Sequence, residues 1–80
     1  MLFAERLYAE RKKAKLSAEK LAKECGISRS YITLIENGKR LPGKKIIPKI
    51  AIALHVKTAV VLNWYLDDIT QKMKKQLKVK

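Results

Sequence analysis

Side chains able to contact a nucleic acid are concentrated in the stretch "SRSYITLIENGKR". Arg29 carries a guanidinium that can pair bidentately with O6 and N7 of guanine, a contact worth about 1–3 kcal/mol of base discrimination. Ser30 and Thr33 carry hydroxyls that can bond bases or phosphates, and the Thr33 methyl group can contact a thymine methyl. Lys39 and Arg40 follow as adjacent cations suited to a phosphate backbone. These residue types predict a base-reading edge followed by a phosphate-contacting loop.

Two short helices joined by a tight turn are expected to position this edge. The first runs from residue 18 to 24 or 25, and the Ser17 hydroxyl can cap it by accepting a bond from a free backbone N–H. Gly26 ends it, because glycine readily takes the left-handed conformation found beyond a helix C-terminus. Ser28 caps the second helix, which continues to Glu36. Such a pair forms a helix-turn-helix, and its second helix fits the major groove of B-DNA, about 12 Å wide.

The other segments have the periodicity of helices over about residues 2–14, 44–54 and 59–77, and no window alternates as a strand does. The expected fold class is all-α, a compact bundle of about five helices with a long C-terminal helix. The 80 residues are expected to form one domain, 1–80, with its core over about 2–66 and a helical extension over about 67–80.

The apolar positions of these helices predict the core. The side chains expected to face it are Phe3, Leu7, Ala14, Leu16, Leu21, Ala22, Ile27, Ile32, Ile35, Ile46, Ile47, Ile50, Ala51, Leu54, Val61 and Trp64, with Tyr8 as a further candidate. The cations expected on the exposed side of the first helix are Arg6, Arg11, Lys12 and Lys13.

The charge balance favours a polyanionic partner. The chain has 19 Lys and Arg against 7 Asp and Glu, a formal net charge of +12. Double-stranded DNA is the leading candidate and an anionic membrane surface the second. One cysteine excludes an internal disulfide framework and suits a reduced, cytoplasmic protein. The N-terminus "MLFAERLYAERKK" does not have the apolar core of a signal peptide, and no window has the ~20 apolar residues of a membrane span.

No group of residues indicates catalysis, a metal site or a cofactor. The sequence offers no Ser-His-acid set, no paired carboxylates and no phosphate-binding glycine loop. Cys25 is expected to be a buried, inert thiol, because nothing beside it marks a lowered pKa. His55 is isolated and is expected to lie at a helix end. Glu36 is expected to satisfy local polar groups or to pair with a nearby cation rather than to act as a catalytic acid.

The segment "LSAEKLAKECGISRSYITLIENGKRLP" resembles the helix-turn-helix of the Xre-type, lambda-repressor-like transcriptional regulators. The resemblance covers about residues 6–62 and implies a bundle of about five helices. It implies a sequence-specific regulator, a repressor by preference, that binds a palindromic operator as a dimer through recognition helix 28–36. The residues that match the family pattern in order are Leu16, Ser17, Leu21, Ala22, Gly26, Ser28, Ile32, Ile35, Glu36, Gly38, Lys39, Arg40 and Pro42.

The resemblance also assigns roles to individual positions. Base edges are read at Arg29, Ser30, Thr33 and Leu34. Phosphates are bound at Ser17, Lys39 and Arg40, and further candidates for phosphate contact are Ser28 at the helix N-terminus and the hydroxyl of a half-buried Tyr31. Three positions depart from the family pattern: Ala18 replaces a frequent Gln that clamps a phosphate, Leu34 stands where Lys, Arg or Gln is common, and Glu10 stands where the first helix usually carries Leu. Leu34 therefore offers an apolar contact to a thymine methyl, or none.

The last predicted helix carries an apolar stripe with spacings of four, three, four and four residues at Leu62, Leu66, Ile69, Met73 and Leu77. The preferred interpretation is a homodimer interface formed by Leu66, Ile69, Met73 and Leu77. A solvated tail is the alternative, since the lysines Lys72, Lys74, Lys75, Lys78 and Lys80 surround it; these also suit flanking DNA or an anionic membrane. A DNA-binding antitoxin, or a protein-interaction module that binds a partner through this helix, remains the second function class, and a peripheral membrane protein the third.

Overall fold

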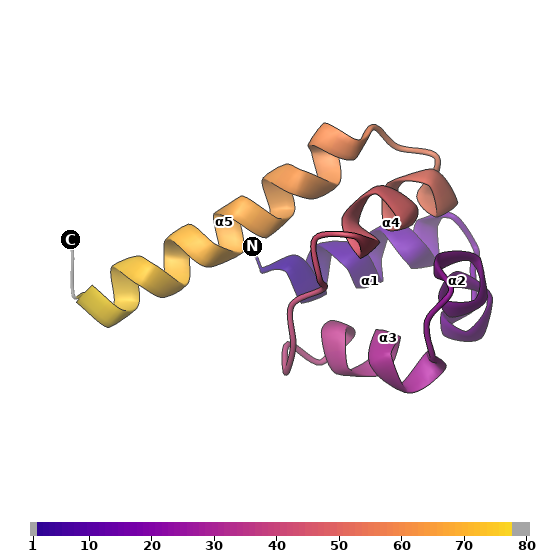
Figure 1. Ribbon diagram of the computed structural model, residues 1–80, viewed down its shortest axis with the longest axis horizontal. Coiled ribbons are helices and arrows are strands. Elements are labelled where there is room, and N and C mark those ends of the chain that lie inside the picture. Colours follow the sequence, from indigo (N-terminus) through magenta and orange to yellow (C-terminus); the bar gives the residue numbers. More distant parts are fainter. Residues whose placement is uncertain (1, 78–80) are drawn as a thin grey trace.

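The computed structural model describes residues 2–77. Five helices follow one another along the chain, and residues 2–77 contain no strand, which confirms the all-α prediction. In Figure 1, α1 to α4 surround a common centre while α5 runs past them and projects away with its C-terminal half. The bounds of the helices are α1 Phe3–Lys13, α2 Ala18–Cys25, α3 Arg29–Glu36, α4 Ile46–Leu54 and α5 Thr58–Leu77. Lys78 and Lys80 of the predicted basic tail lie outside the described residues.

Four helices end in the same backbone motif. At α1 to α4 the chain reverses through a residue of positive φ: Lys15 (59°), Gly26 (68°), Gly38 (74°) and His55 (57°). Beyond each one, the next N–H bonds a carbonyl five residues back, as Ile27 N does to Ala22 O at 3.0 Å. This is the Schellman motif, which satisfies carbonyls that the helix leaves without partners. The predicted helix ends at Gly26 and His55 are confirmed.

The N-termini of α2 and α3 are capped by the predicted serines. The Ser17 hydroxyl accepts a hydrogen bond from Lys20 N at 3.0 Å, and the Ser28 hydroxyl accepts one from Tyr31 N at 3.1 Å. The α4 helix begins at Ile46, about two residues later than predicted. Residues 44 and 45 instead form a turn that is closed by a 3.0 Å bond from Ile46 N to Gly43 O.

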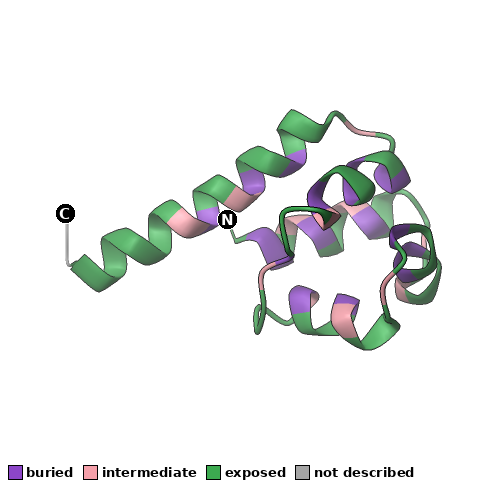
Figure 2. Ribbon diagram, viewed as in Figure 1, coloured by how far each residue is buried: buried purple, intermediate pink, exposed green. Residues whose placement is uncertain are grey.

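The core contains most of the predicted side chains, as the buried segments in Figure 2 indicate. The buried apolar residues are Phe3, Ala4, Leu7, Leu21, Ala22, Cys25, Ile32, Ile35, Ile47, Ile50, Ala51, Ala53, Leu54, Val61 and Trp64. Phe3 and Trp64 meet edge to face with ring centroids 6.0 Å apart, so α5 closes the core over the start of α1. Leu16, Ile27 and Ile46 are half-buried against this core.

Two of the predicted core positions on α1 are exposed instead. Ala14 is the exposed C-terminal cap, because α1 already reverses direction there. Tyr8 is 48% exposed. Tyr8 directly follows the buried Leu7 in the sequence and therefore lies on a different face of the helix. Its ring packs beside the cations of Arg11 and Lys12, which lie 5.4 Å and 5.6 Å from the ring centre.

A buried carboxylate adds a polar contact to the packing that attaches α5 to α1. Asp68 is 3% exposed, and its Oδ2 accepts a 2.9 Å hydrogen bond from the backbone N of Phe3 in the first turn of α1. A negative charge at a helix N-terminus is favourable, because the free N–H groups there carry partial positive charge. Arg6 and Asp67 form an ion pair at 3.5 Å beside it. Beyond this contact, residues 70–77 are exposed all round (Figure 2). No helix within residues 2–77 is long and apolar enough to cross a membrane.

Candidate nucleic-acid interface

The outward face of α3 holds the four residues predicted to read bases. Arg29, Ser30, Thr33 and Leu34 are all exposed, and together they line a shallow hollow of about 550 Å³. Ile32 and Ile35 on the opposite face are 0% and 1% exposed and fix the helix to the core. A side chain on this outward face therefore sits on a rigid element whose orientation is set by packing.

A hydrogen bond within α3 limits which groups of the Thr33 side chain can make outward contacts. Its Oγ1 donates to the carbonyl of Arg29 one turn earlier, at 3.1 Å. The hydroxyl hydrogen is therefore used inside α3, which leaves the oxygen lone pairs and the methyl group to face outward. With the neighbouring Leu34, which is 38% exposed, this end of the hollow presents two apolar groups.

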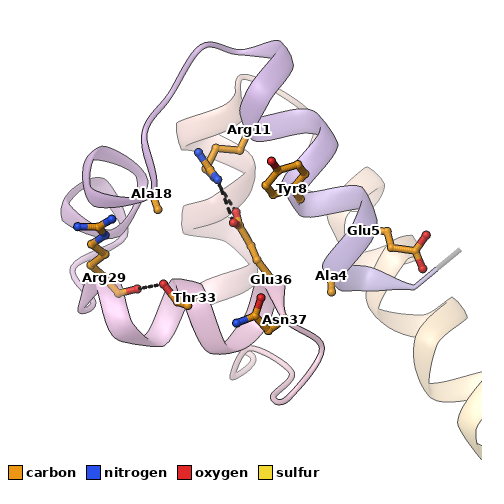
Figure 3. A pocket seen from close by; sticks show the side chains of 9 residues that line it. All are labelled: Ala4, Glu5, Tyr8, Arg11, Ala18, Arg29, Thr33, Glu36 and Asn37. Carbon is orange, nitrogen blue, oxygen red and sulfur yellow. Dashed lines mark hydrogen bonds and ion pairs between the residues drawn. The ribbon is translucent and has the colours of Figure 1, made fainter.

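Arg29 also borders a second depression. This cleft of about 520 Å³ lies between α1 and α3 beside the start of α2 (Figure 3). Its lining residues are Ala4, Glu5, Tyr8, Arg11, Ala18, Arg29, Thr33, Glu36 and Asn37. Figure 3 shows the Arg29 side chain beside Ala18, at the N-terminal end of α3. Because Ala18 stands where the family pattern often has the longer Gln, space next to the Arg29 guanidinium stays open.

A buried ion pair holds the C-terminal end of α3 in place. Arg11 Nε and Nη2 donate to the two Glu36 carboxylate oxygens at 2.7 Å and 3.0 Å, and Arg11 Nη1 donates to the carbonyl of Leu16 at 2.8 Å. Both charged side chains are only 8% exposed. The hydrogen bond to Glu36 raises the pKa of Arg11, so its charge is fixed at all ordinary pH values.

The prediction that Arg11 lies on the exposed side of α1 is wrong, while the prediction that Glu36 pairs with a cation is confirmed. Arg11 is 7% exposed because it follows Phe3 and Leu7 at spacings of four residues, on the same face of α1. That spacing was the signal available in the sequence. A charge at that position requires a partner, and only the fold brings Glu36 to it.

The residues predicted to contact phosphates lie at the N-terminal caps of α2 and α3, within α3 and in the loop that follows α3. Ser17 and Ser28 use their oxygens as caps, so each hydroxyl hydrogen stays available to donate. Lys39 and Arg40 are exposed in the loop after α3. Tyr31 is half-buried, as predicted; its ring packs 5.6 Å from the Arg40 guanidinium carbon, and its hydroxyl oxygen accepts from Gly43 N at 3.4 Å.

Neither Cys25 nor His55 lines the hollow on the outward face of α3. Cys25 is 0% exposed, and burial raises the pKa of its thiol to about 11, as expected for an inert side chain. His55 is the exposed residue that ends α4. Within residues 2–77, no three His, Cys, Asp or Glu side chains gather as metal ligands do.

Comparison with known proteins agrees with this geometry. The sequence model of the family described as "Helix-turn-helix" matches residues 7–61. The ImmF control region 10 kDa protein of Bacillus phage phi105 is 40% identical over 47 residues, 59% of this chain and 52% of that protein. The chain thus aligns with about half the length of this curated relative.

Solved structures show the same fold. The P22 c2 repressor in complex with synthetic operator 9T is similar with a TM-score of 0.73 and 28% identity, over 80% of this chain and 97% of that one. The restriction-modification controller protein C.AhdI from Aeromonas hydrophila gives 0.69 and 36%, over 74% and 89%. The biofilm master regulator SinR in complex with DNA gives 0.70 and 26%, over 76% and 98%. The resemblance predicted from residues 16–42 is confirmed: this chain belongs to the helix-turn-helix family of lambda-repressor-like regulators.

Proposed function

We propose that this protein is a sequence-specific DNA-binding transcriptional regulator of the repressor type. The observation that carries the proposal is the outward face of α3, where four side chains able to read bases line one hollow on a rigidly packed helix. Two similar proteins, the P22 c2 repressor and SinR, are described in complex with operator or DNA. The formal charge of +12 supplies the attraction to phosphates that nonspecific binding requires.

In this proposal α3 enters the major groove with Arg29 and Ser30 toward base edges. Arg29 pairs with a guanine, and the apolar groups of Thr33 and Leu34 lie against thymine methyls. Leu34 then restricts which bases the protein accepts at the base pair that it contacts. The capped N-termini of α2 and α3 approach one phosphate strand through Ser17 and Ser28.

The loop after α3 contacts the other strand through Lys39 and Arg40, whose guanidinium is held beside Tyr31. Two copies then bind a palindrome, with half-sites about 34 Å apart on one face of the duplex. This two-copy arrangement follows from the general rule that operator symmetry mirrors protein symmetry.

Selection of binding sites from random DNA tests the proposal directly. The expected result is a palindrome with G and T at the positions read by Arg29 and Leu34. Arg29→Ala is expected to relax preference at one base pair, at a cost of about 1–3 kcal/mol for the selected site. Lys39→Ala is expected to weaken all sequences about equally and to lower the salt slope by about one.

Lys57→Ala is the matched control, since Lys57 belongs to the connection between α4 and α5, and Figure 1 shows this connection on the opposite side of the domain from α3. This variant should retain the affinity and preference of the wild-type protein. The assignment of base reading fails if Arg29→Ala leaves the ratio of specific to nonspecific affinity unchanged.

The exposed apolar stripe of α5 favours a second candidate, in which the protein also binds a different protein partner through α5, as an antitoxin does. Leu66, Met73 and Leu77 are 48%, 53% and 67% exposed, which is unusual for a solvated helix. Coexpression with the product of a neighbouring gene, followed by size-exclusion chromatography, tests this candidate. A complex that Met73→Lys abolishes supports it, and separate elution of the two proteins contradicts it.

A further inference from the structure

The loop between α3 and α4 carries the two cations proposed to contact phosphates, and its backbone has few hydrogen bonds of its own. Of the N–H groups of residues 40–45, only that of Gly43 donates a hydrogen bond within the described part of the chain. Leu41 is half-buried against the core and Pro42 is buried, so apolar packing holds the middle of the loop. The exposed Arg40 side chain lies just before this packed segment.

Tyr31 of α3 makes two contacts with this loop. The Arg40 guanidinium carbon lies 5.6 Å from the centre of the Tyr31 ring, within the range of a cation–π interaction. At the tip of the same ring, the hydroxyl oxygen accepts the 3.4 Å hydrogen bond from Gly43 N. One side chain of α3 thus reaches both residue 40 and residue 43 of the loop.

The position of Tyr31 is itself fixed. Its backbone N donates to the Ser28 hydroxyl at 3.1 Å in the N-terminal cap of α3. Its half-buried ring packs against the core, and the residue that follows it, Ile32, is fully buried. The ring is therefore a rigid support, and the mobile partner in the contact is the longer Arg40 side chain.

We propose that Tyr31 is a positioning residue that acts through Arg40. The ring holds the guanidinium in one orientation before DNA arrives, and the hydroxyl keeps the loop closed on α3 through Gly43. This inference rests on the proposed function, because the group that Arg40 meets is a phosphate of the DNA backbone. The role differs from the direct phosphate contact by the Tyr31 hydroxyl that the sequence leads us to expect.

The physical basis of this role is a smaller loss of conformational entropy on binding. Immobilising a side chain with many rotamers at an interface weakens binding by about two- to tenfold. A guanidinium that already lies over a ring has given up part of this freedom in the free protein. Its planar group also presents N–H donors in a fixed fork that matches the oxygens of a phosphate.

The same contacts join the two parts of the proposed DNA-binding surface. Ser30, next to Tyr31 in the chain, lies on the outward face of α3, whereas Arg40 belongs to the loop. Tyr31 therefore sets the distance between the proposed base-reading face and a phosphate-contacting cation. Because phosphate contacts fix the register of a protein on the duplex, this distance affects how α3 aligns in the groove.

A double-mutant cycle on DNA affinity tests the proposal. The probe is a mixed-sequence DNA duplex, since a phosphate contact needs no operator. Tyr31→Leu is expected to weaken binding about two- to tenfold, and to have no further effect in a chain that already carries Arg40→Ala. Equal weakening in both backgrounds would show that Tyr31 contacts DNA directly or that its loss damages the whole domain, and either result overturns the proposal.

Two controls accompany the cycle. Lys39 is the neighbouring exposed cation of the loop, but the cation over the Tyr31 ring is that of Arg40. Tyr31→Leu should therefore weaken binding as much in a Lys39→Ala chain as in the wild-type protein. Tyr31→Phe keeps the ring and the packing, so it should retain most of the affinity that Tyr31→Leu loses. A Tyr31→Phe chain that binds as weakly as Tyr31→Leu would contradict the role of the ring.

Arg40→Lys separates orientation from charge. The charge is unchanged, so the slope of log affinity against log salt should stay the same, whereas Arg40→Ala should lower it by about one. The affinity of Arg40→Lys should fall about two- to tenfold in the wild-type background. The loss should be smaller in the Tyr31→Leu background, where no ring orients either side chain, and equal losses would count against the proposal.

The contact between ring and guanidinium can also be measured in the free protein. An aromatic ring shifts the NMR signals of protons held over its face. The Arg40 side-chain signals should therefore move when Tyr31→Leu removes the ring and should stay near their wild-type positions in Tyr31→Phe. Arg40 signals that are the same in Tyr31→Leu and wild type would overturn the proposal without any use of DNA.

These outcomes separate the failure of this inference from the failure of the proposed function. A chain in which Tyr31 and Arg40 are coupled on mixed-sequence DNA, but which selects no DNA sequence, retains this inference and loses the proposed function. A chain that selects an operator, while Tyr31→Leu and Arg40→Ala act additively, retains the proposed function and loses this inference.

Discussion

Removal of one partner from the buried pair between Arg11 and Glu36 is the sharpest perturbation this fold offers. Arg11 makes three hydrogen bonds, two to the Glu36 carboxylate and one to the Leu16 carbonyl, and both charged side chains are 8% exposed. In Arg11→Met the carboxylate of Glu36 stays buried without its cation, and the Leu16 carbonyl loses a donor. We expect this variant to have a much lower free energy of unfolding than the wild-type protein and to unfold at a moderate temperature.

The size of the effect follows from the burial. Breaking a buried ion pair from one side costs about 3–5 kcal/mol, because an uncompensated charge is left behind. A domain of this length has a total stability of about 4–12 kcal/mol, so the loss is a large part of it. Each kcal/mol shifts the melting temperature of such a small domain by about 4–8 °C, so the expected fall exceeds about 10 °C.

The double variant Arg11→Met/Glu36→Leu should recover most of this loss. Apolar replacements of a buried pair are often neutral or stabilising, since no charge needs to be desolvated. The unmatched Leu16 carbonyl still costs about 1 kcal/mol. Since removal of either partner alone costs about 3–5 kcal/mol, the coupling energy between positions 11 and 36 in a double-mutant cycle is expected to be at least about 3 kcal/mol.

Urea unfolding followed by circular dichroism measures each of these values. Arg6→Met is the matched control: it removes an arginine from the same helix, but its partner Asp67 is 3.5 Å away and the two side chains are 33% and 52% exposed. That pair should contribute at most about 1 kcal/mol. The reasoning is refuted if Arg11→Met costs no more than Arg6→Met.

Three further changes give separate checks. Gly26→Ala should lower the free energy of unfolding by about 1 kcal/mol through backbone strain alone, because φ is +68° and no atom lies within 4 Å of the added Cβ. Lys15→Gly should raise it by up to about 1 kcal/mol, since Lys15 has a φ of 59°; urea unfolding measures both, and a loss of stability in Lys15→Gly would contradict this account. Burial raises the pKa of the Cys25 thiol from 9.0 to about 11. The stabilisation of the folded state that is linked to this shift is therefore fully present below pH 9 and is lost as the pH rises toward 11. Wild type should therefore lose up to about 2–3 kcal/mol more than Cys25→Ala across this range, and parallel pH profiles of the two proteins would show that the thiol does not titrate differently on folding.

The sequence predicted the helices and the outward face of α3 because both depend on local pattern. Apolar spacing of three and four residues identified the buried faces of Ile32 and Ile35, and hydroxyl side chains at Ser17 and Ser28 marked the caps. Gly26 marked the turn because few other residues tolerate positive φ. These signals act within one or two turns of helix, so the order of residues along the chain is sufficient to read them.

The prediction for Arg11 was wrong, and no role was predicted for Asp68. Both failures have a physical reason that is not local. Each is a charged residue that is buried only because a distant group meets it: Glu36, 25 residues away, for Arg11, and the backbone of Phe3, 65 residues away, for Asp68. A charge at a helix position that faces the core is disfavoured unless it is paired. No local pattern states which partner the fold will bring.

The sequence by itself determined that this chain forms a helix-turn-helix bundle with Arg29, Ser30, Thr33 and Leu34 on the outward face of α3, because helix periodicity, caps and turn residues are local properties. Only the tertiary structure decided which charges are buried, that α3 is held at its C-terminal end by Arg11, and that α5 is fixed to the start of α1 by Asp68. Those outcomes depend on electrostatic pairing between groups far apart in the chain, and only the packed fold sets the distances between them.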